Sequence, residues 1–228
     1  EGENVIVEVA EAVRLSKPLH NIIGTWSRDS EGVIHRNAKD PLVDINRYRP
    51  DFSLFDETRF YRPMGGKVFK MIPVETFRGC PYSCTYCNSP TQREFSKNNN
   101  LGNFLRRKSM DVLRQEICDY IETYEPGFFY FVDDVFLARP KSEIFEFCDM
   151  YQEFGLPFWF NTRSESCEPD ILARLKEVGC YRISFGIECG NEQYRQKVLR
   201  RKISNDELIY RFNEIIAKSG IVFSLNVI

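Results

Sequence analysis

The chain has 228 residues and a formal net charge of −2, from 31 basic and 33 acidic side chains, a balance that points to neither nucleic acid nor an anionic membrane as a partner. Hydrophobic residues make up 43% of the chain, enough for a sizeable core, and no apolar run approaches the roughly 20 residues that span a bilayer. The length allows one large domain or one and a half ordinary ones.

The first 40 residues predict a small region of their own. Apolar residues recur on one helical stripe and predict a helix over 3–15. Residues 22–26 and 32–34 are apolar segments on either side of a polar turn, and they predict two short strands. We expect this region to precede the main domain.

Residues 41–66 predict an extended linker. Prolines punctuate this segment, which is otherwise rich in charged and aromatic residues, and proline disfavours helix at its own position and at the one before it. The composition changes on both sides of it. We therefore place one domain at 1–40 and a second at 67–228.

From residue 67 onward, strand and helix patterns alternate. One predicted strand ends at residue 77, and the others cover 128–132, 158–160, 181–187 and 221–228. The helices between them begin after Ser109, near Ser142, at Pro169 and after Ser204. Repeated βα units predict an α/β fold with a parallel sheet and right-handed crossovers. The periodicity alone does not distinguish an open, doubly wound sheet from a barrel.

Three cysteines follow the first predicted strand at the spacing C-x3-C-x2-C: Cys80, Cys84 and Cys87. A closed zinc site takes four ligands, and a four-iron cluster is usually held by four thiolates. A compact triplet therefore predicts a cluster with one open iron. Half of a zinc site completed by a distant cysteine, or three unpaired thiols, are the alternatives.

The remaining cysteines do not indicate a disulfide framework. Cys118 and Cys148 fall within helical patterns, and the chain is much larger than a typical disulfide scaffold. No signal peptide is visible at the start of the chain. We therefore expect a cytoplasmic protein, with both of these thiols in the core.

Polar residues follow the other predicted strands of this βα pattern. One strand ends in Asp133 and Asp134, the next runs into Arg163, and the third contains Ser184 and ends at Glu188. In βα barrels, functional residues collect at the carboxyl ends of the strands. The alternatives are an Asp pair that caps a loop and an arginine in a structural ion pair.

The cysteine motif, with Tyr86 directly before its last cysteine, resembles the signature of the radical S-adenosylmethionine (SAM) superfamily. The resemblance implies a partial (βα)6 barrel, of which this chain covers about five strands. It also implies a [4Fe–4S] cluster on the three thiolates, with SAM chelated to the fourth iron. Reductive cleavage of SAM would give methionine and a 5′-deoxyadenosyl radical, with a flavodoxin or ferredoxin as electron donor.

The resemblance also implies roles for the polar strand ends. Asp133 and Asp134 stand where family members place a motif that accepts hydrogen bonds from the SAM amino group. Glu188 lies in a Gly-Ile-Glu segment whose glutamate binds the SAM ribose, and Arg163 would pair with the SAM carboxylate. Tyr86 would present its backbone carbonyl to the adenine. Ser184, on the same strand as Glu188, completes the expected set of SAM contacts.

The amino-terminal region resembles, more weakly, the tail of a Rossmann-like cobalamin-binding domain and its connector. The Asp-x-His-x-x-Gly motif that ligates cobalamin is absent from these residues, so we expect the cobalamin site upstream of residue 1. We also expect at least one further βα unit beyond residue 228, because the chain ends within a strand pattern.

The implied function is cobalamin-associated methyl transfer or carbon-skeleton rearrangement on an unknown small molecule or peptide. A sulfur-inserting or ring-forming radical SAM enzyme is an alternative from the same superfamily. A non-enzymatic module that binds zinc or an iron–sulfur cluster is an alternative of a different class.

Overall fold

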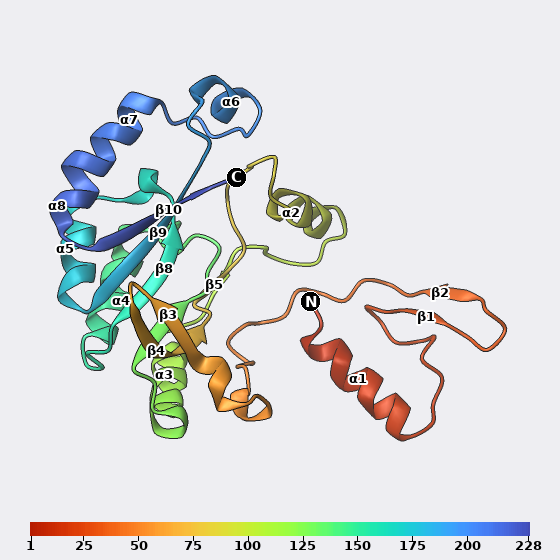
Figure 1. The fold of residues 1–228 in the computed structure, drawn as a ribbon. Helices are drawn as coiled ribbons and strands as arrows, with labels where there is room; N and C mark the ends of the chain where they lie inside the picture. Colours follow the sequence, from red (N-terminus) through yellow and green to blue (C-terminus); the bar gives the residue numbers. More distant parts are fainter.

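A computed structural model describes all 228 residues (Figure 1). Its centre is a curled six-stranded sheet with the order β10-β9-β8-β7-β4-β3. Five strands are parallel neighbours: β4 (Lys67–Val74), β7 (Phe128–Phe131), β8 (Phe158–Thr162), β9 (Cys180–Glu188) and β10 (Val222–Val227). This arrangement confirms the predicted α/β fold with a partial parallel barrel.

Helices accompany the sheet along the chain. They are α1 (Glu3–Arg14), α2 (Ser89–Asn98), α3 (Met110–Tyr124), α4 (Lys141–Tyr151), α5 (Pro169–Glu177), α6 (Glu192–Lys197), α7 (Asn205–Tyr210) and α8 (Ala217–Ser219), with a π-helical turn over Arg211–Ile216 between the last two. Short 3-10 helices lie at Phe52–Leu54, Glu57–Phe60 and Ser164–Ser166. None of the helices combines the length and the apolar composition needed to cross a membrane.

The helices begin where the sequence provides caps. The Ser109 hydroxyl accepts a hydrogen bond from the Val112 backbone N–H at 3.3 Å, and the Ser204 hydroxyl accepts one from Glu207 N–H at 3.1 Å. Pro169 is the first residue of α5, where the missing N–H has no helical partner to lose. These three starts confirm the helix starts predicted from the sequence.

The main core lies between the convex face of the sheet and the helices. It is a cluster of 27 buried residues, in which Phe129 and Phe131 of β7 meet Phe158 and Phe160 of β8. Alternate residues of a strand point to opposite faces, so these four side chains share one face. Figure 1 shows α3, α4, α5 and α8 along this side of the sheet.

The predicted linker ends earlier than expected, because its last residues form β3 (Tyr61–Met64), which pairs antiparallel with β4. Pro63 has no N–H to donate, and proline in a sheet is confined to edge strands or bulges. Since β3 is the last strand of the sheet, this proline costs no interior ladder bond. The prolines led the sequence analysis to miss this strand.

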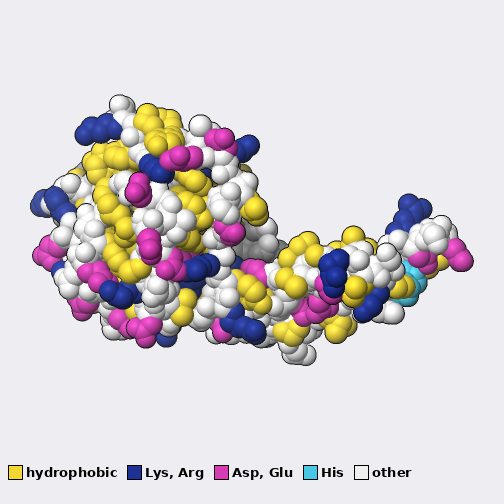
Figure 2. All heavy atoms as spheres, turned by 90° about the horizontal axis from the view of Figure 1, so that it is seen from below, with side chains coloured by type: hydrophobic (Ala, Val, Ile, Leu, Met, Phe, Trp, Pro, Cys, Tyr) yellow, Lys and Arg dark blue, Asp and Glu magenta, His cyan; other side chains and the backbone are white.

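The amino-terminal region projects from the barrel as an arm (Figure 2). It contains α1 and a two-stranded hairpin of β1 (Trp26–Arg28) and β2 (Ile34–Arg36). Both strands start later than predicted. The Asp29 carboxylate accepts hydrogen bonds from Glu31 N–H and Val33 N–H, and these bonds fix the turn between β1 and β2.

Candidate functional site

A cavity of about 400 Å³ opens at the carboxyl end of the parallel strands. It brings together residues from the loop after β4 and from the ends of β7, β8 and β9. Its lining includes all nine predicted site residues: Cys80, Cys84, Tyr86, Cys87, Asp133, Asp134, Arg163, Ser184 and Glu188. Residues up to about 110 positions apart in the sequence therefore surround one space.

The cysteine loop has no regular secondary structure and is held by hydrogen bonds to segments outside it. Arg93 of α2 donates to the carbonyl oxygens of Cys80 at 2.9 Å and Tyr82 at 3.2 Å. Thr85, inside the loop, donates through its hydroxyl to the Val198 carbonyl at 2.6 Å. The loop is thus tied both to the helix that follows it and to the segment after α6.

The three predicted thiol ligands lie around one space. Cys80 is buried, Cys84 is half-buried and Cys87 is exposed, and all three line the same cavity. A cube of irons and sulfides needs its cysteines around it, at separate corners.

The structure divides the predicted Asp pair into two different environments. Asp133 is buried, and its carboxylate accepts hydrogen bonds from Thr76 N–H at 2.7 Å, Phe77 N–H at 2.9 Å and Arg139 Nη2 at 2.6 Å. These partners occupy its oxygens, so Asp133 joins the end of β4 to the loop after β7. Asp134 has no such partners and is free to meet a ligand.

The electrostatic environment of Asp134 is unfavourable to its charge. Partial desolvation raises the pKa of the Asp134 carboxyl, and the negative charges of Asp133 and Glu75 add to the rise. A positively charged group in the cavity would offset both effects. An ammonium group is the simplest ligand of that kind.

Glu188 ends β9 in a left-handed conformation, with φ +63°. Its carboxylate accepts a hydrogen bond from Arg201 Nη1 at 3.2 Å, and the Arg201 side chain is only 1% exposed. A Cβ on Gly186 would overlap Glu188 Oε1, so the glycine leaves room for the carboxylate in this position. The backbone and the arginine together set the direction of Glu188.

Arg163 is engaged within the protein. Its Nη2 donates to Glu165 Oε1 at 2.6 Å, and its guanidinium carbon lies 3.8 Å from the centre of the Tyr82 ring. Glu165 also accepts from Arg201 Nη2 at 3.0 Å. Burial opposes the charge of Glu165, but Arg201 and Arg163 outweigh it and lower the pKa of this carboxyl. The structural ion pair raised as an alternative for Arg163 is therefore present.

Tyr86 belongs to the cysteine loop, whereas Ser184 lies within β9, before Glu188. Burial raises the pKa of the Tyr86 hydroxyl, and the neighbouring Glu188 carboxylate adds to the rise. The Ser184 hydroxyl accepts a hydrogen bond from Trp159 Nε1 at 2.8 Å and bonds the Ser224 hydroxyl at 2.7 Å. Its bonds thus connect the parallel strands to one another, below the level of Glu188.

Sequence reasoning missed three residues that organise this site: Arg93, Glu165 and Arg201. Arg93 carried a weak signal, because it lies one helical turn into the helix after the cysteine motif. Arg201 lies 13 residues beyond Glu188 in a segment without regular structure. No periodicity or motif marks such a residue, because only the folded chain brings it back to the strand end.

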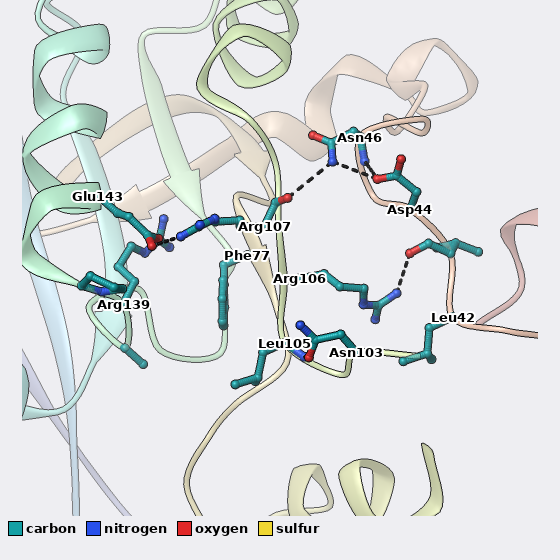
Figure 3. Close-up of a pocket in the computed structure, with 13 residues that line it drawn as sticks. Leu42, Asp44, Asn46, Phe77, Asn103, Leu105, Arg106, Arg107, Arg139 and Glu143 are labelled. Carbon is teal, nitrogen blue, oxygen red and sulfur yellow. Dashed lines mark hydrogen bonds and ion pairs between the residues drawn. The ribbon is translucent and has the colours of Figure 1, made fainter. Parts of the chain in front are cut away.

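A larger cavity, of about 650 Å³, lies away from the cysteines and between the linker, β6 (Arg106–Arg107) and the start of α4 (Figure 3). Each of its arginines already has a carboxylate partner: Arg106 pairs with Glu1, Arg107 with Glu143 and Arg139 with Asp133. Arg106 also donates to the Val43 carbonyl at 2.7 Å. The contact between Arg106 and Val43 fastens the linker to β6.

Comparison with known proteins agrees with this geometry. The family model described as the radical SAM superfamily matches residues 74–227. An uncharacterised methyltransferase of Pyrococcus horikoshii is 26% identical over 193 residues, which cover 82% of this chain and 39% of that protein. Cytidylyl-2-hydroxyethylphosphonate methyltransferase of Streptomyces wedmorensis is 24% identical over 192 residues, which cover 83% of this chain and 32% of that protein.

Solved structures share the fold. The cobalamin-dependent SAM radical enzyme OxsB, with aqua-cobalamin bound, superposes with a TM-score of 0.73 at 19% identity, over 100% of this chain and 32% of that one. The radical SAM methyltransferase TsrM from Kitasatospora setae, with tryptophan and a SAM analogue bound, gives 0.67 at 16% identity, over 98% of this chain and 44% of that one. The chain spans about a third of the length of the curated relatives it matches.

Proposed function

This chain belongs to the radical SAM superfamily, and from that membership we propose that it forms the SAM-binding and cluster-binding part of a methyltransferase. One observation carries the proposal: the three cysteines share a single cavity with Asp134 and Glu188 at the carboxyl end of a parallel sheet. The family binds a [4Fe–4S] cluster and SAM, and the cluster, when bound, supplies the electron that cleaves SAM.

The side chains take separate roles in the proposal. Cys80, Cys84 and Cys87 hold the cluster. Asp134 accepts hydrogen bonds from the SAM ammonium, which offsets the desolvation of its own carboxylate. Glu188, oriented by its backbone and by Arg201, accepts from the ribose hydroxyls.

The other predicted contacts are distributed differently. We assign Asp133 and Arg163 to positioning, because Arg139 and Glu165 already bind them. Tyr86 offers its backbone carbonyl to the adenine. We assign Ser184 to the substrate side of the site rather than to SAM, because its hydroxyl is bonded to Trp159 and Ser224 deeper on the strands.

Cobalamin enters the proposal as the methyl carrier. Its support is the likeness of the fold to cobalamin-dependent enzymes and the sequence similarity to proteins named as methyltransferases. We propose that residues 1–40 belong to a cobalamin-binding-like unit and that the linker connects it to the barrel. A flavodoxin or ferredoxin would reduce the cluster, and the cytoplasm, where thiols stay reduced, is the proposed location.

Anaerobic reconstitution of the protein with iron and sulfide tests the proposal. We expect a brown protein with about four irons per chain, the content of a cuboidal cluster. Given SAM, dithionite and cobalamin, it should form 5′-deoxyadenosine or S-adenosylhomocysteine, as followed by chromatography. A colourless protein that binds one zinc per chain would overturn the proposal, and a brown protein that leaves SAM intact would reduce it to an iron–sulfur module.

A further inference from the structure

A second space adjoins the cluster cavity on the concave side of the sheet. It has a volume of about 590 Å³ and shares three lining residues with the cluster cavity: Asn161, Ser184 and Asn226. Because these three residues border both spaces, the two spaces are direct neighbours. We call the lower space the lumen pocket.

The strands line the lumen pocket with two rows of side chains. Strand register places Tyr130, Trp159 and Arg182 side by side as the lower row. Asn161 and Ser184 form the upper row on the same strands, two residues further along, which is about 7 Å nearer the cysteines. The cluster cavity lies above the upper row.

Below the rows, three aromatic side chains pack together. Phe69, Phe128 and Tyr181 pack against one another with ring centroids 4.9 to 5.7 Å apart, near the amino-terminal ends of their strands. Phe128 is completely buried. These rings pack the amino-terminal end of the sheet and do not line the lumen pocket, whose walls are therefore set by the two rows above them and by β3.

The polar groups of the two rows bond to one another, with one exception. Asn161 Nδ2 donates to the Tyr130 hydroxyl at 2.6 Å, and Trp159 Nε1 donates to Ser184 Oγ at 2.8 Å. The Tyr130 and Trp159 rings are stacked with their centroids 4.2 Å apart. The exception is the guanidinium of Arg182.

Arg182 has no partner for its charge. It forms no ion pair and donates no side-chain hydrogen bond, and its Nε is buried. The lining of the lumen pocket contains a second arginine, Arg62 of β3, and no Asp or Glu. A half-buried guanidinium without a carboxylate partner has lost part of its hydration, and an anion in the pocket would replace what it has lost.

We infer that the lumen pocket binds the substrate and that the substrate is a small organic oxyanion, a carboxylate or a phosphate or phosphonate, held by Arg182. A guanidinium matches such groups with two parallel hydrogen bonds. With the anion at the lower row, the rest of the molecule extends past Ser184 toward SAM. This inference rests on the proposed function, because that function makes the occupant of the pocket a substrate.

Binding of probe molecules tests the inference apart from catalysis. Saturation-transfer NMR would measure binding of phenylphosphonate, benzoate and neutral benzyl alcohol to the reconstituted protein. We expect either anion or both to bind, and benzyl alcohol to bind about tenfold more weakly or worse. Preference for one anion would distinguish a phosphorus oxyanion from a carboxylate as the natural group.

Substitutions test whether Arg182 is the residue that binds the anion. Arg182→Gln should weaken anion binding by about tenfold or more, and Arg182→Lys should restore part of it. Arg47→Gln, the same change at an exposed arginine of the linker, should leave binding unchanged. Cluster content and SAM binding should stay normal in all three variants.

The outcomes separate this inference from the proposed function. Equal binding of the anions and benzyl alcohol, or equal anion binding by Arg182→Gln and the unsubstituted protein, would overturn the inference even if SAM is cleaved. Anion binding that depends on Arg182 in a protein that does not cleave SAM would support the pocket and overturn the proposed function.

Discussion

The two faces of the curled sheet are made by the same strands and have opposite characters. On the convex face, Phe131 and Phe160 belong to a core that buries 27 residues. On the concave face, their neighbours Tyr130 and Asn161 are half-buried, polar and hydrogen-bonded to each other. The difference shows that alternate residues of one strand have different roles: those on the convex face stabilise the fold, and those on the concave face surround the site. Substitutions at adjacent residues should therefore have separate effects, one on stability and the other on the site.

The largest effect should come from the mouth of the concave face. Replacing Cys84 with Ala should abolish the four-iron cluster and all SAM cleavage, since two thiolates do not hold a cuboidal cluster. The fold should persist, because Cys84 lies outside the convex core. Iron analysis and circular dichroism measure the two results.

The matched control for this variant is Cys118→Ala, a thiol on α3 that does not line the cavity and that is half-buried, not in the core as predicted; of the two thiols predicted there, only Cys148 lies in the core. The control variant should keep its iron. A full iron content in Cys84→Ala, or its loss in Cys118→Ala, would contradict the assignment of the ligands.

The next effect belongs to the convex face. Phe131 is fully buried and contacts Phe136, Phe147, Tyr151 and Phe158. Its replacement by Ala should lower the free energy of unfolding by about 3–5 kcal/mol, since it removes apolar contact and leaves a cavity. Urea unfolding measures the change.

Val132 provides the comparison for Phe131, because it is the next residue and faces the cluster cavity. Val132→Ala should change the free energy of unfolding by less than about 1 kcal/mol, because this side chain is 40% exposed. Similar losses for the two variants would contradict the division of the faces.

This division also explains what the sequence could and could not predict. The strand at 128–132 is marked by a run of consecutive apolar residues, and the helix starts are marked by a serine or proline beside a helical pattern. Both signals lie in residues that are neighbours in the sequence, so the order of strands and helices was predictable. The three cysteines were predictable for the same reason. The pairing of Asp133 with Arg139 and of Glu188 with Arg201 depends on how loops return to the strand ends, and no local pattern encodes that.

A smaller effect should follow from Glu188→Ala, again on the concave face. It should weaken SAM binding by about 1.5–3 kcal/mol, the range for hydrogen bonds to charged groups, and leave the cluster spectrum unchanged. Equilibrium dialysis with SAM measures the affinity. Glu122→Ala, at an exposed position of α3, should bind SAM normally, and an unchanged affinity in Glu188→Ala would assign that residue to structure alone.

The smallest effect should be a gain in stability from a change on the concave face. The pKa of Asp134 is raised in the folded protein, so its ionised form costs folding free energy at pH values above the folded pKa. Asp134→Asn removes that cost. We expect the variant to be more stable at pH 7 by less than about 1 kcal/mol, because solvent screens a carboxylate that faces an open cavity.

The pH dependence of stability should run in opposite directions for Asp134, whose pKa is raised, and for Glu165, whose pKa is lowered. The gain in Asp134→Asn should vanish as the pH falls toward about 3.9, where the unfolded carboxyl also becomes neutral. The pKa of Glu165 is lowered, so Glu165→Gln should instead lose stability at pH 7, with the loss shrinking as the pH falls below about 4.3 and through the lower folded pKa. Denaturant midpoints of both variants between pH 3 and pH 7 measure these trends. If Asp134→Asn lost stability at pH 7, Asp134 would be part of the supporting structure, like Asp133, rather than a charge kept for a ligand.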